Sequence, residues 1–146
     1  MGAARSAYIT VDRLGAPRCA GGVCTTVRDL ARVGQLIVQG GARGSTQILP
    51  ESWIDDITRN GDPDAWAAGN GAIYFPGLPI RYRSKWYVQD GEPPMLFGLG
   101  IHGQNLFVDR THGIVIAKVS SQALPMDTAR IALTMRAASR IVEFLA

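Results

Sequence analysis

A histidine in a glycine-rich segment is the first candidate for chemistry in this chain. His102 lies in Gly98-Leu-Gly-Ile-His-Gly103, and Gln104 follows. Glycines are disfavoured inside a strand, so this pattern indicates a place where another group approaches the backbone closely. An imidazole there could exchange a proton near neutral pH, because its ordinary pKa is about 6.5. The segment is therefore the candidate wall of a site.

A serine–histidine–aspartate triad can be assembled from Ser120, His102 and Asp109. The chain has no G-x-S-x-G elbow to expose a serine nucleophile, and such trios occur by composition alone. The sequence therefore disfavours a triad within the chain. The other histidine, His112, falls in a predicted hairpin turn and is expected to be structural.

The two cysteines, Cys19 and Cys24, have C-x4-C spacing without a second pair. Zinc needs four ligands, and the two histidines flank a predicted hairpin instead of standing one helical turn apart. We expect no metal and two free thiols, which weakly favours a reducing compartment. Met1–Arg5 has no apolar stretch of a signal peptide, and no apolar run reaches 18 residues. We expect a cytoplasmic protein without membrane contact, and leave a periplasmic or secreted location open.

Length and composition favour one globular domain. The chain has 146 residues, 47% of them hydrophobic, and a formal net charge of +3. Its 15 basic residues are scattered rather than clustered. Nucleic-acid binding needs a basic patch or stripe, so we expect a mixed-charge surface and no nucleic-acid partner.

Three helices are predicted from their ends and their apolar spacing. The first follows an N-cap at Thr25 or Thr26 and stops at the glycine pair 40–41. The second starts at Pro50 and reaches about Thr58. The third is capped by Asp127 and runs to Ala146, with a wide apolar stripe that could cover a sheet.

Between these helices the chain reads as strands. The ranges 85–88, 95–101, 105–109 and 114–120 are strand candidates joined closely enough to be antiparallel, and 7–11 is a further β-rich run. The range 114–119 is apolar nearly throughout, which predicts cover on both faces. The range 59–79 reads as a long loop with Trp66, Tyr74 and Phe75, either held by these aromatics or forming a pocket wall. The predicted fold class is α+β, an antiparallel β-sheet flanked by helices.

Three segments carry a resemblance to a known family. They are Ala20–Leu36, with the pattern G-G-x-x-x-T-x-x-D-L-A-R-x-G, then Leu49–Ile54, and Gly100–Gln104. Together with the strands and the last helix, they resemble the C-terminal part of the serine β-lactamase-related hydrolases. This superfamily includes class C β-lactamases, penicillin-binding-protein-like esterases and 6-aminohexanoate-dimer hydrolases. The resemblance covers nearly the whole chain.

The resemblance implies that residues 1–146 are the C-terminal segment of a β-lactamase/transpeptidase-like α/β domain with an incomplete sheet. The nucleophile of the family lies in S-x-x-K and is assisted by Y-x-N, but no serine here has lysine three residues later and no tyrosine has asparagine two residues later. We therefore expect a fragment of a serine hydrolase that is inactive alone. An unpaired sheet edge would favour association.

By the same resemblance, the backbone N–H of Ile101 is the candidate oxyanion donor, with that of His102 as the alternative. His102 itself takes the place of a K-T-G cation, which favours an ester or linear amide as the parent's substrate. Gly100, Gly103 and Gln104 are expected to border the substrate, as are two aromatic residues of the neighbouring strand, Trp86 and Tyr87. The parent would form an acyl-serine intermediate with no metal or organic cofactor. A non-catalytic binding or regulatory fragment is the alternative.

Overall fold

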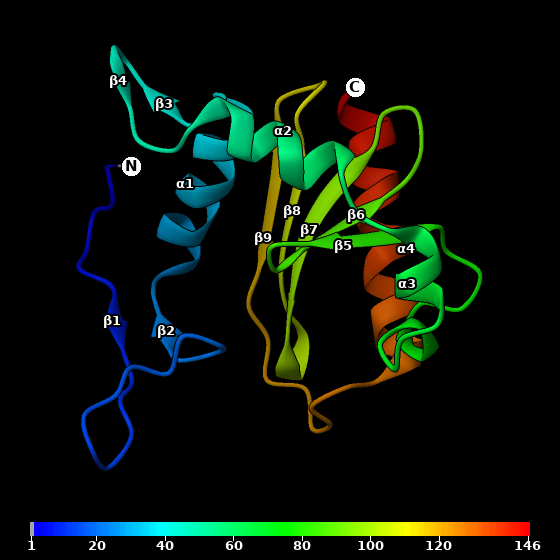
Figure 1. Cartoon of the computed structure of the whole chain (residues 1–146), viewed down its shortest axis with the longest axis horizontal. Coiled ribbons are helices and arrows are strands. Elements are labelled where there is room, and N and C mark those ends of the chain that lie inside the picture. The colour runs from blue at the N-terminus through cyan, green and yellow to red at the C-terminus, as the bar shows by residue number, and fades with distance from the viewer. Residues whose placement is uncertain (1) are drawn as a thin grey trace.

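A five-stranded antiparallel sheet forms the centre of the fold in the computed structural model, which describes residues 2–146 (Figure 1). Its strands follow chain order, each hydrogen-bonded to the next. They are β5 (Ile80–Arg83), β6 (Trp86–Gln89), β7 (Met95–Gly100), β8 (Gln104–Asp109) and β9 (Ile114–Lys118). The last four are the predicted strands, with ends shifted by one or two residues. β5 was not predicted.

Helices cover both faces of this sheet. The helices α1 (Val27–Val38) and α2 (Glu51–Arg59) lie on one face, and α4 (Thr128–Leu145) on the other (Figure 1). Each face of the sheet therefore has its own hydrophobic core, and adjacent residues of a strand point into different cores. Leu96 packs with α1 and α2, whereas Phe97 packs with α4. This arrangement confirms the predicted α+β class, a sheet between helices.

The helix ends follow the predicted caps. The Thr26 side chain accepts a hydrogen bond from the backbone N–H of Asp29, and Asp127 accepts one from the N–H of Arg130. Gly34 lets α1 lie close to β9, because a Cβ built there would stand 2.5 Å from a methyl carbon of Val115.

The predicted long loop is more ordered than expected. It contains α3 (Pro63–Ala67), which starts with Asp62 as its N-cap, and the 3-10 turn η1 (Ala72–Tyr74). Trp66 and Phe75 pack with Tyr87 of β6, with ring centroids 5.5 Å from it in both cases. The loop is therefore held by its own aromatic residues, and the prediction of a structureless stretch was wrong because the cap at 62 and Pro63 start a short helix.

Two small hairpins complete the architecture. β1 (Tyr8–Ile9) pairs with β2 (Val23–Cys24), and β3 (Ala42–Arg43) pairs with β4 (Thr46–Gln47). Both cysteines are free thiols. β9 is an outer strand, with both faces partly covered and no second strand beside it among residues 2–146. No helix in this range is long and apolar enough to cross a membrane.

Candidate active site

The candidate site is built on η2 (Ile101–Gly103), the turn that joins β7 to β8. His102 lies in the left-handed backbone region at φ 57°, and Gly103 follows at φ 84°. That region is disfavoured for a residue with a side chain, so neighbouring groups must hold the turn in place. The predicted strands 95–101 and 105–109 are therefore joined by a tight turn, with a histidine in its left-handed position.

The last residue of β9 and the segment after it supply these groups, and we call residues 118–125 the clamp segment. The N–H of His102 donates to the carbonyl of Pro125 at 2.9 Å, and the N–H of Gln122 donates to the carbonyl of His102 at 3.1 Å. The Nδ1 atom of His102 lies 2.8 Å from the carbonyl oxygen of Gln122. Because a carbonyl only accepts, Nδ1 carries the proton, and the neutral ring keeps a lone pair on Nε2.

Two further side chains connect the turn to the clamp segment. Gln104 pairs with the backbone of Ser120 in both directions, donating from Nε2 to its carbonyl and accepting from its N–H at 3.1 Å. Lys118 donates from Nζ to the carbonyl of Gly103 at 2.8 Å. The turn is thus fixed from both the backbone and the side chains.

The close approach expected at the glycines comes from the protein itself. A Cβ at Gly100 would stand 2.8 Å from Cβ of Gln104, and one at Gly103 would stand 2.5 Å from the amide of Gln122. At Gly98 no atom lies within 4 Å of a built Cβ. The pattern therefore marked a tightly closed turn.

The two candidate oxyanion donors differ in their surroundings. The N–H of His102 is bonded to the clamp segment. Ile101 is 59% exposed at the surface of the turn. Of the pair, Ile101 is therefore the more exposed residue, whereas the N–H of His102 is already bonded.

Trp86 and Tyr87 lie on opposite faces of the sheet. Trp86 packs against the core under α1 and α2, whereas Tyr87 stacks on Phe97 with ring centroids 5.0 Å apart. Burial, with a smaller effect of Tyr82, raises the pKa of the Tyr87 phenol. The two aromatics therefore contribute to different cores.

The triad that the sequence disfavoured is not formed. Asp109 is the last residue of β8, and Gln104, beside the His102 turn, is the first. The two residues are five positions apart, which corresponds to about 17 Å along the strand. Its carboxylate accepts from the N–H groups of Thr111 and His112 and lies 2.7 Å from Nδ1 of His112. His112 thus stabilises the β8–β9 turn, as predicted.

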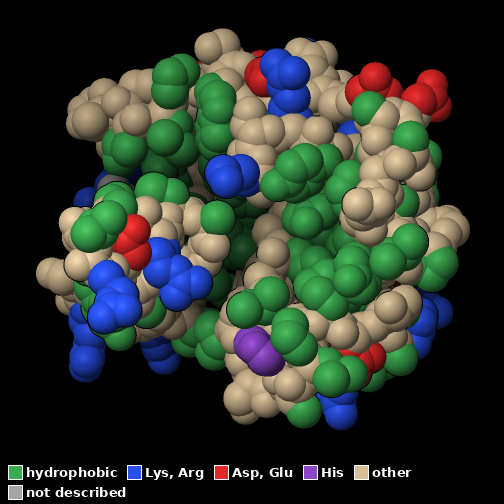
Figure 2. Space-filling model, turned by 60° about the horizontal axis from the view of Figure 1, so that its bottom comes forward, with side chains coloured by type: hydrophobic (Ala, Val, Ile, Leu, Met, Phe, Trp, Pro, Cys, Tyr) green, Lys and Arg blue, Asp and Glu red, His purple; other side chains and the backbone are tan. Residues whose placement is uncertain are grey.

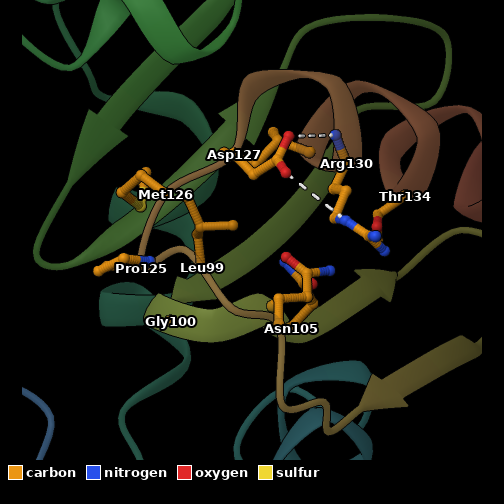
Figure 3. A pocket seen from close by; sticks show the side chains of 11 residues that line it. Leu99, Gly100, Asn105, Pro125, Met126, Asp127, Arg130 and Thr134 are labelled. Carbon is orange, nitrogen blue, oxygen red and sulfur yellow. Dashed lines mark hydrogen bonds and ion pairs between the residues drawn. The ribbon is translucent and has the colours of Figure 1, made fainter.

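Asn105 is a second polar residue beside the turn, and it was not predicted from the sequence. It is 4% exposed and lines a small cavity of about 10 Å³ together with Gly100, Asp127 and Arg130 (Figure 3). The alternation along β8 could have revealed it, because Asn105 shares the α4 face with Phe107.

The space-filling view shows a hollow bordered by hydrophobic side chains, with a histidine near its margin (Figure 2).

Comparisons with known proteins agree with this architecture. No sequence model of a known family matches the chain. The 6-aminohexanoate-dimer hydrolase of Paenarthrobacter ureafaciens is 36% identical over 117 residues, which are 80% of this chain and 29% of that protein. A solved structure titled "Putative 6-aminohexanoate-dimer hydrolase from Bacillus anthracis" superposes with a TM-score of 0.73 at 31% identity, over 90% of this chain and 32% of that one.

The chain thus spans about a third of the length of these relatives. The match nevertheless includes most of the sheet, helices and turns described above, because it covers 80% and 90% of the chain. The chain therefore belongs to the β-lactamase-related hydrolase family, is similar to its 6-aminohexanoate-dimer hydrolases, and corresponds to the C-terminal part of these proteins.

Proposed function

We propose that the turn Ile101–Gly103 forms one wall of an acyl-transfer site, in a serine hydrolase whose nucleophile lies outside this chain. One observation carries the proposal: six hydrogen bonds fix the turn and its neighbour Gln104 against the clamp segment. An oxyanion donor must be held before the reaction starts, because its benefit depends on needing no reorganisation.

In the proposed reaction, a serine oxygen attacks the carbonyl carbon of an ester or linear amide. The carbonyl oxygen gains negative charge, and the backbone N–H of Ile101 donates a hydrogen bond to it. The leaving alcohol or amine departs with a proton, and water then hydrolyses the acyl-serine. Stabilisation by one such donor corresponds to roughly 2.7–4 kcal/mol.

His102 would contact the substrate through Nε2. Since Nδ1 donates to Gln122, the neutral ring offers Nε2 as an acceptor for an amide N–H or a hydroxyl group of the substrate. The protonated ring would instead donate to a carboxylate. Gly100, Gly103 and Gln104 would shape this wall by keeping the turn closed.

The chain alone is expected to be inactive. It contains seven serines, none followed by lysine in the S-x-x-K spacing. Incubation with p-nitrophenyl acetate should release nitrophenol no faster than a heat-denatured sample. Turnover that disappears when one of these serines is changed to alanine would contradict the proposal.

A chimera tests the role of Ile101. The matching segment of the Paenarthrobacter hydrolase is replaced by this chain, and hydrolysis of the 6-aminohexanoate dimer is measured. Ile101→Pro removes the N–H, and Gly100 before it has the extended backbone (φ −109°, ψ 156°) that precedes proline readily. Ile101→Ala is the matched control, since it removes the side chain and keeps the N–H.

We expect Ile101→Pro to lower kcat by a factor on the order of 10²–10³, and Ile101→Ala to stay within a few-fold of the unmodified chimera. Equal activities of the two variants would refute the assignment. A folded chimera that retains Ile101 but hydrolyses nothing would refute the proposed function as a whole.

A further inference from the structure

A second cavity lies at the opposite end of the sheet, beside the β8–β9 turn. Its volume is about 520 Å³. Three arginines from different elements line it: Arg59 at the end of α2, Arg81 in β5 and Arg110 after β8. Its other lining residues are two threonines and three apolar residues, so no carboxylate lines it.

The three guanidinium groups differ in how fully they are bound. Arg81 is held by four hydrogen bonds, two to Asp90 and two to the last carbonyls of α2. Arg110 has one ion pair, at 3.3 Å from Asp55, and its Nε is buried without a hydrogen-bond partner. Arg59 is exposed and forms no ion pair within residues 2–146. Arg59 and Arg110 therefore retain most of the free hydrogen-bonding capacity of the three groups.

The local charge balance favours an anion. Two carboxylates from outside the lining pair with two of the arginines, Asp90 with Arg81 and Asp55 with Arg110, which leaves the charge of Arg59 uncompensated. Thr111 adds a hydroxyl group at the rim. The planar guanidinium fork matches the oxygens of carboxylates and phosphates, to which it donates two hydrogen bonds at once.

We propose that this cavity is a binding site for a small oxyanion, a carboxylate or phosphate group attached to a short apolar body. Arg59 and Arg110 would bind the charged group, while Val38, Pro94 and Leu96 form the apolar part of the wall. The site stands at the other end of β8 from Ile101–Gly103, so it is separate from the proposed acyl-transfer wall. The inference does not depend on the proposed function.

The test is an NMR titration of the isotope-labelled chain with two probes at constant ionic strength. Inorganic phosphate represents a free tetrahedral anion, and adipate represents a carboxylate on an apolar chain; chloride is the reference. We expect saturable shifts of the Arg110 and Thr111 amides and of the arginine Nε–H signals. Tighter binding of adipate would identify a carboxylate with an apolar body as the ligand class, and tighter binding of phosphate a phosphoryl group.

Four variants make the result specific. Arg59→Gln and Arg110→Gln should each weaken binding on the order of tenfold, which corresponds to about 1.4 kcal/mol. Asp55→Asn should tighten binding roughly two- to fivefold, because it removes the competing carboxylate of a partly exposed pair. Arg13→Gln, an exposed arginine of the β1–β2 connection, is the control and should bind like the unmodified chain.

Arg59 is exposed, so its variant keeps the test informative even where Arg110→Gln unfolds the chain. Shifts that grow linearly with phosphate and adipate as they do with chloride would overturn the proposal. Binding that is unchanged by Arg59→Gln and by Asp55→Asn would overturn it as well.

Discussion

Gln104 is the residue whose removal should loosen the candidate site most selectively. Its amide lies between the turn and the clamp segment, donating to the carbonyl of Ser120 and accepting from its N–H. Gln104→Ala leaves both backbone groups of Ser120 without these partners in a partly buried place. At about 1 kcal/mol net for each hydrogen bond, the expected loss in the free energy of unfolding is about 2 kcal/mol.

A loss of this size should lower Tm by about 4–8 °C in a chain of this length. The assay is urea unfolding combined with amide hydrogen exchange of Ser120 and Gln122. Exchange at these two amides should accelerate more than exchange in the core strand β7. Gln35→Ala on the exposed side of α1 is the matched control, and its effect should stay within about 0.5 kcal/mol.

Gln104→Glu adds a pH signature to the same test. The carboxylate can still accept from the Ser120 N–H, but its second oxygen faces the Ser120 carbonyl, so repulsion should raise the folded-state pKa above the ordinary value of about 4.3. Because the pKa is higher in the folded state, the protonated carboxyl group stabilises the fold. This contribution to the free energy of unfolding is present below about pH 4 and is lost as the pH rises. The clamp account is refuted if Gln104→Ala matches the control in stability and in exchange, or if Gln104→Glu has no such pH dependence.

Further predictions follow from other parts of the fold. The N–H of Ala4, with help from Thr26 and Arg32, lowers the pKa of Asp29 from 3.8 to about 2. The stability that this ionised carboxylate provides is present above about pH 4 and is lost as the pH falls towards 2. Asp29→Asn should remove this part of the loss of stability at low pH, as measured by urea unfolding at several pH values. An unchanged pH dependence in the variant would contradict the prediction. Phe97→Ala removes a fully buried ring and should cost about 3–5 kcal/mol in urea unfolding, whereas Phe144→Ala, 88% exposed, should cost little. The outer edge of β9 should cause concentration-dependent association in sedimentation, which a lysine in place of the exposed Val119 should reduce. A chain that stays monomeric at every concentration would contradict association through the edge of β9.

The sequence predicted most of the elements because their signals are local. Thr26 and Asp127 fix the starts of two helices through a side-chain hydrogen bond within one turn. The strands were predicted from their β-rich runs, and the pleat of β7 then places the neighbours Leu96 and Phe97 in different cores. The short strand β5 was missed because its residues Ile80–Arg83 alternate apolar and basic side chains within a turn-rich context.

The site was only partly predictable, since its contacts are long-range. The residues that hold the turn, Lys118, Ser120 and Gln122, lie 15 to 20 residues away from their partners. Nothing in their own surroundings in the sequence indicates this role. Trp86 and Tyr87, both expected to border the substrate, pack on opposite faces of the sheet because neighbours in a strand point to opposite faces.

The central claim concerns the position of the Ile101 N–H, and a crystal structure of the chimera inhibited by a phosphonate ester tests it most directly. The phosphonylated serine imitates the tetrahedral intermediate, and its phosphoryl oxygen marks the place of the oxyanion. The account predicts this oxygen at about 2.7–3.1 Å from the backbone nitrogen of Ile101, with the six hydrogen bonds of the turn retained. A phosphoryl oxygen bound by other donors, with the turn Ile101–Gly103 away from the inhibitor, would contradict it.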